Sequence, residues 1–312
     1  MNNLNRTILK IKKKFGQQAI GRVKDLKRVD VERISTGSPY LDWATQGGFP
    51  RGRTVEIYGP YSSGKTLCVL RTIVSAQKQG LSCVFIDSER AFDPKFAEKL
   101  GVDLDKLVLV RETEGEKVFD IIGLLLQGDV GIITVDSVAS LVPQFEEENP
   151  IQQQTMALQA RLMSKALRKL TGAIGKSNTL VIFINQIREK LSSYGNPEIT
   201  SGGRALGFYS SLRIEVRRGD WILKNKKKIG QMIKFRVTKS KVCPAWKEGA
   251  FKYFYKGTFD EIYEIVTLLL LNGKIIRTGG WYKVLGQRFQ GRAELEKKIK
   301  TDNKFKEQLL KL

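Results

Sequence analysis

Hydrophobic and polar positions follow one repeating arrangement from about residue 29 to residue 260, in which short, nearly all-apolar runs are separated by longer stretches with helical spacing. Such runs are typical of parallel strands covered on both faces. Their alternation with helices predicts a three-layer α/β fold with a mostly parallel central sheet. The predicted strands are residues 54–58, 83–87, 107–110, 131–135 and 180–185. The predicted helices are residues 65–80, 94–100, 115–128 and 154–171.

The pattern changes after the last of these strands. Three further apolar runs have no long helices between them, so we expect them to extend the sheet in an antiparallel fashion. They are residues 211–217, 231–238 and 250–255. Beyond residue 260, a helical stretch, a turn at Gly279-Gly280 and a second helical stretch predict a small α+β C-terminal domain. The two helical stretches are residues 261–271 and 292–312.

The first residues repeat apolar side chains at helical spacing. Leu4, Ile8, Ile11 and Phe15 fall on one face of a helix over residues 4–15, and basic residues occupy other positions. Such a basic arm docks on its own domain or on a neighbouring subunit, and the alternative is a membrane surface. We therefore expect an N-terminal helical arm, a core and a C-terminal domain. Their expected bounds are residues 1–28, 29–260 and 261–312.

The charge of the chain narrows the choice of partner. Its 312 residues include 54 Lys and Arg against 32 Asp and Glu, which gives a formal net charge of +22. A basic excess of this size is typical of proteins that bind nucleic acid. The alternative is a general lysine bias of the proteome.

Residue types that are rare or absent exclude several classes of protein. The sequence has no histidine, which excludes Ser-His-Asp triads, histidine metal sites and histidine general bases. Cys68, Cys83 and Cys243 lie far apart, which disfavours a disulfide framework or a zinc site and fits a reducing cytoplasm. The longest apolar run, residues 265–271, is too short for a membrane span, and the first residues lack a signal-peptide core. We therefore expect neither membrane insertion nor secretion.

A phosphate-binding loop follows the first predicted core strand. Residues 59–66, GPYSSGKT, fit the pattern G-x-x-x-x-G-K-[ST] between a strand and a helix. The loop amides and the helix N-terminus bind phosphate oxygens, Lys65 reaches the β- and γ-phosphates, and Thr66 binds Mg²⁺. The predicted ATP-binding residues of this loop are Gly59, Pro60, Tyr61, Ser62, Ser63, Gly64, Lys65 and Thr66.

Polar residues follow the neighbouring strands at their carboxyl ends, which share one crevice in a parallel sheet. Asp136 can hold the hydration shell of the magnesium ion. Gln186 can sense a γ-phosphate and pass the signal to the loop that follows it. A carboxylate is also needed to polarise the attacking water, and Asp87, Glu89 and Asp93 compete for that role on position alone.

Four motifs together resemble the bacterial RecA recombinase family. They are residues 59–66, 85–94 (FIDSERAFDP), 135–138 (VDSV) and 178–188 (NTLVIFINQIR). Many ATPases share the phosphate loop, whereas the run at 178–188 is much more specific. The resemblance extends over most of the chain, and it implies a RecA-like ATPase core.

The resemblance also implies roles for individual residues. Glu89 matches the catalytic carboxylate of the family, and Asp93, Phe96 and Tyr255 match its adenine contacts. Lys239 and Lys241 match lysines that reach the γ-phosphate from the neighbouring subunit, so ATP would lie between protomers of a filament. The catalytic set implied in this way is Glu89, Lys65, Gln186, Lys239 and Lys241.

Two segments offer contacts for a first DNA strand. Arg161, Ser164 and Arg168 fall on one helix stripe, which suits a phosphate track or, as the alternative, a solvated basic face. The resemblance assigns these three residues to the primary strand and makes Met156 a wedge between base triplets. Residues 188–203 form a long stretch without helix or strand pattern, as functional loops do. There we expect Leu191 as a wedge and the amides of Gly202 and Gly203 as phosphate contacts.

A second DNA site is predicted on a later strand. Lys234 and Arg236 alternate along residues 231–238 and therefore point to one face. With Arg217 and Arg218 they match the secondary DNA site of the resembled family. The alternative is an ordinary solvated strand face.

Together these features predict a DNA-dependent ATPase that forms helical filaments on single-stranded DNA and catalyses strand exchange in recombinational repair and the SOS response. Its expected cofactors are ATP and Mg²⁺. Its expected partners are single- and double-stranded DNA, further copies of the chain, a LexA-type repressor and a single-strand-binding protein. A ring-forming helicase or clock-type ATPase and a non-hydrolysing DNA coat protein are the alternatives. Residues 301–312 lack an acidic tail, so we expect little autoinhibition of duplex binding.

Overall fold

A computed structural model of the chain describes residues 3–17, 19–21, 31–148, 157–189, 198–310 and 312. It contains two compact units, residues 1–32 and 33–312. In the first unit, α1 (Asn3–Phe15) follows the predicted amphipathic pattern, and none of its side chains is buried. Leu4 and Phe15 are 58% and 67% exposed, whereas Ile8 and Ile11 on the same stripe are half-buried.

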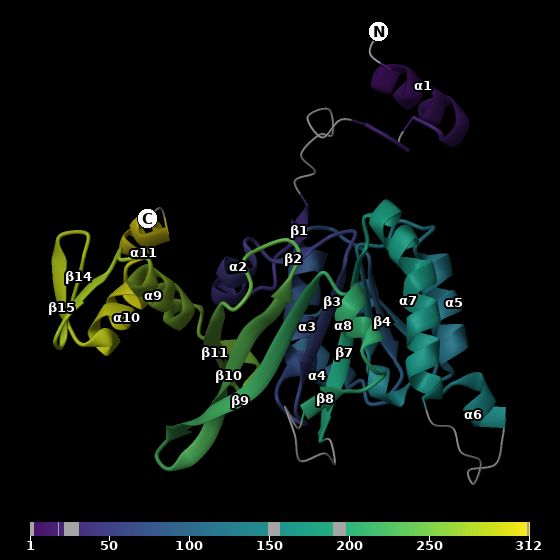
Figure 1. Cartoon of the computed structure of the whole chain (residues 1–312). Coiled ribbons are helices and arrows are strands. Elements are labelled where there is room, and N and C mark those ends of the chain that lie inside the picture. The colour runs from purple at the N-terminus through teal and green to yellow at the C-terminus, as the bar shows by residue number, and fades with distance from the viewer. Residues whose placement is uncertain (1–2, 18, 22–30, 149–156, 190–197, 311) are drawn as a thin grey trace. The chain divides into compact units, whose positions relative to one another are not determined.

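A ten-stranded sheet forms the centre of the second unit, in the order β12-β11-β10-β9-β3-β7-β6-β4-β5 with β8 beside β7 (Figure 1). Neighbours from β9 to β5 are parallel, and those from β9 to β12 are antiparallel. The prediction of a mostly parallel α/β sheet is thus confirmed. The core strands are β3 (Thr54–Gly59), β4 (Cys83–Asp87), β5 (Leu107–Val110), β6 (Ile132–Asp136) and β7 (Leu180–Glu189). The others are β8 (Glu198–Thr200), β9 (Leu212–Lys224), β10 (Lys227–Ser240), β11 (Glu248–Phe254) and β12 (Thr258–Phe259).

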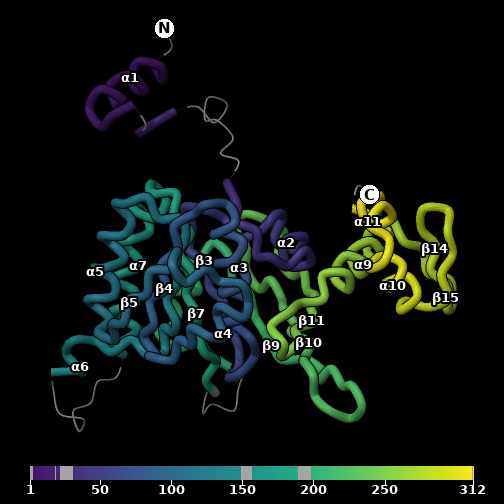
Figure 2. The backbone as a smooth tube through the Cα atoms, turned by 180° about the vertical axis from the view of Figure 1, so that it is seen from behind, coloured from purple at the N-terminus to yellow at the C-terminus, as the bar shows by residue number. Residues whose placement is uncertain are grey.

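Helices cover both faces of the sheet because its strands are apolar on both sides. Within β7, Ile182 and Ile184 pack toward α2 (Pro39–Thr45), α3 (Lys65–Lys78) and α4 (Pro94–Lys99). Val181 and Phe183 pack toward α5 (Gly115–Leu125) and α7 (Leu158–Ser177) on the other face. Figure 2 shows the unit from behind, with α3 and α4 across the strands. Short elements complete the layers: β1 (Arg33–Ile34), β2 (Phe49–Pro50), η2 (Leu104–Lys106), η3 (Val138–Ser140), α6 (Gln144–Glu148) and α8 (Ala205–Tyr209).

The C-terminal residues have a hydrophobic cluster of their own, which includes Val266, Tyr282, Leu295 and Phe305. It joins three helices to a small antiparallel sheet, and these segments lie side by side in Figures 1 and 2. The elements are α9 (Glu261–Leu271), β13 (Ile276–Thr278), β14 (Trp281–Val284), β15 (Gln287–Gln290), α10 (Arg292–Thr301) and α11 (Asn303–Leu310). Each helix in the described segments is too short or too polar to cross a membrane.

Several predicted elements were wrong in detail. The strand expected at 211–217 in an antiparallel extension is β9, which lies parallel to β3 and antiparallel to β10. The helix expected over 292–312 is two helices, because Asp302 adopts an extended backbone and accepts the N–H of Phe305 at 2.9 Å.

The unpatterned stretch 188–203 is also partly regular. β7 continues to Glu189, and β8 pairs with its end, with Ile187 opposite Thr200. The helix expected over 154–171 is described from Leu158 and continues to Ser177.

Candidate active site and DNA-binding surfaces

The carboxyl ends of four parallel strands place the candidate active site. β3 pairs with β7 so that Gly59 lies opposite Gln186, and β4 pairs with β6 so that Asp87 lies opposite Asp136. The backbone N–H groups of Ser88 and Glu89 donate to the carbonyl of Asp136 at 2.8 and 3.2 Å. The polar residues predicted at these strand ends are therefore held at one edge of the sheet.

The phosphate loop joins β3 to α3. A Cβ at Gly59 would lie 1.9 Å from the carbonyl oxygen of Val216 on β9, so this position requires glycine. Gly64 precedes the helix in the left-handed region with φ of 98°. The ammonium group of Lys65 folds over the loop and donates to the carbonyls of Gly59 and Pro60 at 3.2 and 2.8 Å. Tyr61 is 85% exposed at the turn of the loop.

Burial and the neighbouring carboxylates have opposite effects on the pKa of Lys65. Its side chain is buried at the start of α3, and this burial lowers the pKa of the amine, against Asp136 and Glu89, which raise it. Phosphate oxygens would replace the two carbonyls as acceptors and, being anionic, would raise the pKa of the amine again.

Thr66 and Asp136 form a pair of oxygen ligands beside the loop. The hydroxyl of Thr66 donates to the carboxylate of Asp136 at 2.8 Å. Burial is the largest cause that raises the pKa of Asp136, to about 6, so the carboxylate lacks a full counter-charge here. A hydroxyl and a carboxylate are hard oxygen donors that fit a hydrated magnesium ion.

Glu89 is the carboxylate that contacts the strand-end amide. Its Oε1 accepts the hydroxyl of Ser137 at 2.6 Å and the side-chain N–H of Gln186 at 2.7 Å. The other two candidates are engaged elsewhere. Asp87 is buried and accepts the N–H groups of Ala91 and Phe92, both at 3.0 Å, and Asp93 caps α4 by accepting the N–H of Phe96 at 3.1 Å.

A cleft of about 250 Å³ opens at the phosphate loop. It is lined by residues 62–67 together with Phe96, Gln231 and Tyr253. Of the predicted adenine contacts, Phe96 is in this cleft, and Asp93 lies at the start of the same helix. Tyr255 directly follows the end of β11, with its ring 6.0 Å from that of Tyr253.

Lys239 and Lys241 form their hydrogen bonds away from the phosphate loop of their own chain. Lys239 donates to the carbonyls of Gly207 and Phe208 at 2.6 and 2.9 Å, and Lys241 donates to Phe208 at 3.2 Å. Burial is the main cause that lowers the pKa of Lys239, and the neighbouring charge of Lys241 adds to it. Both lysines therefore rest on the end of α8.

The predicted primary DNA contacts lie on α7 and at the end of the long loop. Arg161, Ser164 and Arg168 are all exposed, on the side of α7 away from the core. Gly202 and Gly203 have φ of 74° and 73°, and they line a cavity of about 370 Å³ with the start of α7. Met156 and Leu191, the two predicted wedges, lie outside the described residues.

The predicted secondary DNA face carries both signs of charge. Lys234 and Arg236 are exposed on β10, and Arg217 lies opposite Lys234 on β9. Arg217 pairs with Glu198, and also with Glu215 at 2.5 Å.

The remaining arginines of this set differ in their surroundings. Arg236 pairs with Glu248 at 3.0 Å. Arg218 is not among the residues that line the pocket over Arg217, Lys234 and Arg236; it packs 4.8 Å from the ring centroid of Trp221. Three of the four basic residues predicted as one set therefore line one pocket, and Arg218 lies outside it.

Sequence reasoning missed a buried polar network below the active site. Asn185 donates its side-chain N–H groups to Glu56 and to the carbonyl of Ser201, both at 3.0 Å. Arg213 pairs with Glu56 at 2.5 Å. The network ties β3 to β7 and to the end of the long loop. A glutamate in the middle of the apolar run 54–58 is the signal that could have found it.

The chain is similar to one protein family along most of its length. Residues 2–260 match the family model of the RecA N-terminal domain. A Protein RecA from Chlorobaculum parvum is 44% identical over 307 residues, 97% of this chain and 88% of that protein. One from Thioalkalivibrio sulfidiphilus is 45% identical over 289 residues (91% and 84%). One from Mycoplasma mycoides is 42% identical over 311 residues (98% and 90%).

Proposed function

The chain belongs to the RecA family of DNA recombinases, and we propose that its polar strand ends form the ATP-hydrolysing centre of a DNA-pairing filament. The predicted family and function are confirmed: this is an ATP-dependent DNA recombinase and a DNA-dependent ATPase that acts in recombination and repair. It binds single- and double-stranded DNA and forms homo-oligomeric filaments. Family membership favours the filament over the ring-forming helicase and the inactive coat protein.

The proposed chemistry is hydrolysis of the γ-phosphate of ATP by a water that Glu89 orients and deprotonates. The observation that carries this role is the bond from Gln186 to the Glu89 carboxylate at 2.7 Å, next to the phosphate loop. Lys65 would hold the β- and γ-phosphates in place of its present carbonyl acceptors. Thr66 and Asp136 would hold a magnesium ion, which neutralises phosphate charge when bound.

Gln186 supplies the proposed link between ATP and DNA. A γ-phosphate would compete with Glu89 for the amide of Gln186. Gln186 belongs to β7, whose last residues pair with β8. The proposed first-strand contacts are Arg161, Ser164, Arg168, Gly202 and Gly203. The proposed second-strand contacts are Arg217, Lys234 and Arg236, with Arg218 on a separate surface. Asp93, Phe96 and Tyr255 would hold adenine. Lys239 and Lys241 of a neighbouring protomer would leave α8 and reach the γ-phosphate.

Further expectations complete the proposal. Residues 1–28 would serve as the oligomerisation arm, 29–260 as the ATPase core and 261–312 as a small separate domain. A LexA-type repressor and a single-strand-binding protein are the proposed protein partners. The proposed compartment is the cytoplasm, where bacterial DNA and ATP occur together.

The test measures ATP turnover with and without single-stranded DNA and images the same sample by electron microscopy. We expect DNA to stimulate turnover and helical filaments to form only with ATP or a non-hydrolysable analogue. Lys65→Ala should abolish both responses, because it removes the cation of the phosphate loop. Closed rings, or an ATP turnover rate that does not change when single-stranded DNA is added, would contradict the proposal.

A further inference from the structure

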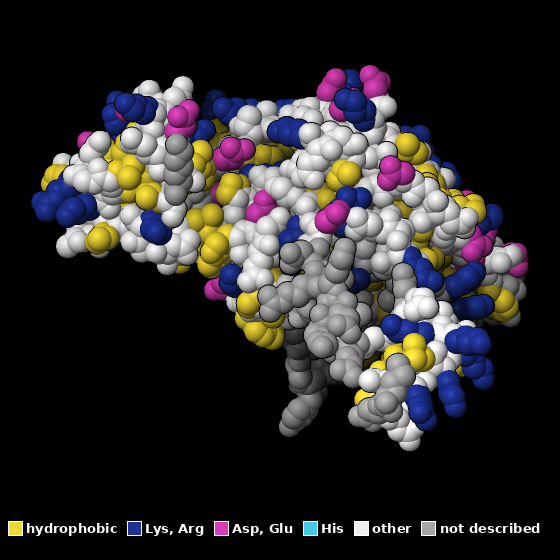
Figure 3. All heavy atoms as spheres, turned by 90° about the horizontal axis from the view of Figure 1, so that it is seen from above, with side chains coloured by type: hydrophobic (Ala, Val, Ile, Leu, Met, Phe, Trp, Pro, Cys, Tyr) yellow, Lys and Arg dark blue, Asp and Glu magenta, His cyan; other side chains and the backbone are white. Residues whose placement is uncertain are grey.

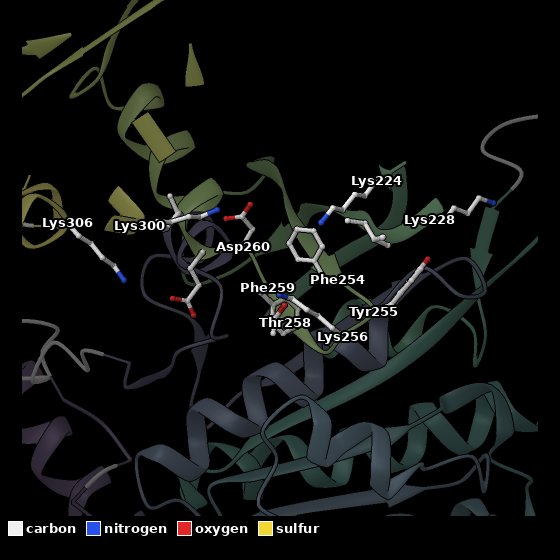
Figure 4. A pocket seen from close by; sticks show the side chains of 13 residues that line it. Lys224, Lys228, Phe254, Tyr255, Lys256, Thr258, Phe259, Asp260, Lys300 and Lys306 are labelled. Carbon is white, nitrogen blue, oxygen red and sulfur yellow. The ribbon is translucent and has the colours of Figure 1, made fainter. Parts of the chain in front are cut away.

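A pocket of about 810 Å³ opens between the β9–β10 hairpin, the turn after β11 and the C-terminal helices (Figure 4). Tyr255 is on its rim, and otherwise the pocket is separate from the residues assigned above to ATP and DNA. Its lining includes the lysines Lys224, Lys228, Lys256, Lys300 and Lys306.

The lysines come from four different parts of the fold. Lys300 and Lys306 extend from α10 and α11 on one side, and Lys224 extends from the end of β9 toward Phe254 on the other (Figure 4). Lys256 rises from the turn between β11 and β12. Lys228 points away, with its ammonium group 4.3 Å from the ring centroid of Trp221. The tertiary fold thus gathers four like charges around one space.

Little negative charge balances these lysines. The pocket has two carboxylates, Asp260 and Glu261. Asp260 is already engaged, because it accepts the N–H of Tyr263 at 3.1 Å and pairs with Lys252 at 3.4 Å. Among the described residues, none of the five lining lysines has an ion-pair partner. Basic side chains are also widespread on the face seen in Figure 3, yet here they converge on a pocket. An anion in this pocket would relieve the mutual repulsion of the ammonium groups.

The walls of the pocket indicate the kind of anion. Phe254 presents an aromatic ring in the pocket, and Ile229 and Ile262 add apolar surface. Tyr255 is 40% exposed at the rim, with its ring 6.0 Å from that of Tyr253. Inorganic phosphate would leave this surface unused. Cationic grooves with exposed aromatic rings are typical of sites for single-stranded nucleic acid, where phosphates meet the cations and bases stack on the rings. The volume lies in the range of a site for one or a few nucleotides.

We propose that this pocket binds a short segment of single-stranded DNA, with phosphates on Lys224, Lys300 and Lys306 and a base against the ring of Phe254. The site is separate from the proposed contacts on α7, the long loop and the β9–β10 face. It would give a filament an additional contact with a DNA strand, beside the C-terminal helices.

The first experiment compares two triple variants of the full chain. The pocket variant is Lys224→Gln, Lys300→Gln and Lys306→Gln. The matched control is Lys226→Gln, Lys297→Gln and Lys304→Gln, which removes the same charge from the same hairpin and helices at exposed positions outside the pocket. Thermal melting of both variants checks that they fold.

The readout is the affinity for a fluorescein-labelled oligothymidylate at several salt concentrations, with a non-hydrolysable ATP analogue present. Each phosphate contact with a single strand contributes a slope of about −0.7 in log K against log salt, so loss of three contacts should flatten the slope by about 2. We expect this change, and at least a tenfold weaker affinity at low salt, in the pocket variant alone. Equal slopes in the two variants would overturn the proposal.

The second experiment separates a DNA strand from a free nucleotide. Oligothymidylate that contains 4-thiothymidine should photo-crosslink to the peptide with Phe254 in the unmodified chain and in the control, but not in the pocket variant. Equilibrium dialysis with radiolabelled ATP should give the same number of ATP molecules per chain for both variants. Loss of one ATP from the pocket variant alone would show that the pocket binds free nucleotide, which overturns the assignment to DNA.

Discussion

The hydrogen bonds of Glu89 allow the effect of Glu89→Gln on ATP turnover to be predicted. The carboxylate accepts two hydrogen bonds, and Glu89→Gln would keep its size while removing its basicity. A general base contributes about 10²- to 10⁴-fold to a rate, so we expect DNA-stimulated turnover to fall by at least about 100-fold. ATP binding should persist, and filaments should outlast those of the unmodified chain. Steady-state ATPase assays and nucleotide-binding titrations check both statements.

Asp93→Asn is the matched control for that substitution. Asparagine caps a helix as well as aspartate does, so α4 and the bond to the N–H of Phe96 should be kept. Because Asp93 is also a proposed adenine contact, the KM for ATP should rise, but turnover at saturating ATP should stay near that of the unmodified chain. A loss in Asp93→Asn that equals the loss in Glu89→Gln would move the proposed base to the other carboxylate.

Residues of the phosphate loop could be predicted because their chemistry depends on a local pattern. GPYSSGKT fixes its glycines, its lysine and its threonine within eight neighbours, and the strand and helix around it are where the sequence predicts them. Ser137 was missed although it follows Asp136 directly. Its role depends on a hydrogen bond to Glu89, 48 residues away, and no local pattern encodes such a partner.

At the scale of elements, β8 connects the active site to the second DNA face. It pairs with the end of β7, and its Glu198 forms an ion pair with Arg217 on β9. An arginine held by carboxylates is less available to DNA phosphates. We therefore predict that Glu198→Gln strengthens duplex binding by the nucleotide-free protein. An exposed ion pair contributes about 0.2–1 kcal/mol, so the gain should be at most about fivefold.

Fluorescence anisotropy with a labelled duplex at low salt measures this gain. Glu98→Gln removes the same charge from an exposed position on α4 and is the control for net charge. Adding Arg217→Gln to Glu198→Gln should cancel the gain. An equal gain in Glu98→Gln would attribute the effect to net charge and leave Glu198 without a specific role.

The same segment shows which elements a sequence can predict. Both faces of the core strands are buried, so each of these strands is a continuous apolar run. Such a run can be recognised in the sequence without knowing which strands lie beside it. β8 and β15 have three and four residues, too few to show a period. β8 pairs with the much longer β7, and β15 pairs with β14, which is equally short. The break between α10 and α11 depends on one capping aspartate within an otherwise helical stretch.

At the scale of the whole second unit, one buried ion pair joins the C-terminal helices to the ATPase core. Glu264, in the first turn of α9, is fully buried and pairs with Arg71 of α3 at 2.9 Å. It also accepts the hydroxyl of Ser38 and the N–H of Tyr40. Arg71 is in turn 4.1 Å from the ring centroid of Phe259. Burial raises the pKa of Glu264 above its usual value in spite of Arg71, so this charge depends on every partner it has.

Removing one member of this pair should therefore cost far more than removing both. Glu264→Ala leaves the buried guanidinium of Arg71 without its counter-charge. We predict that it lowers the free energy of unfolding by about 3–5 kcal/mol. The double variant Arg71→Met with Glu264→Leu replaces the pair by apolar side chains and should lose much less. Glu261→Ala, an exposed position in the same helical turn, should change stability by no more than about 1 kcal/mol. Urea denaturation of the four proteins decides the matter. If Glu264→Ala and the double variant lose the same free energy, the pair contributes packing alone, and its charge does not hold the C-terminal helices to the core.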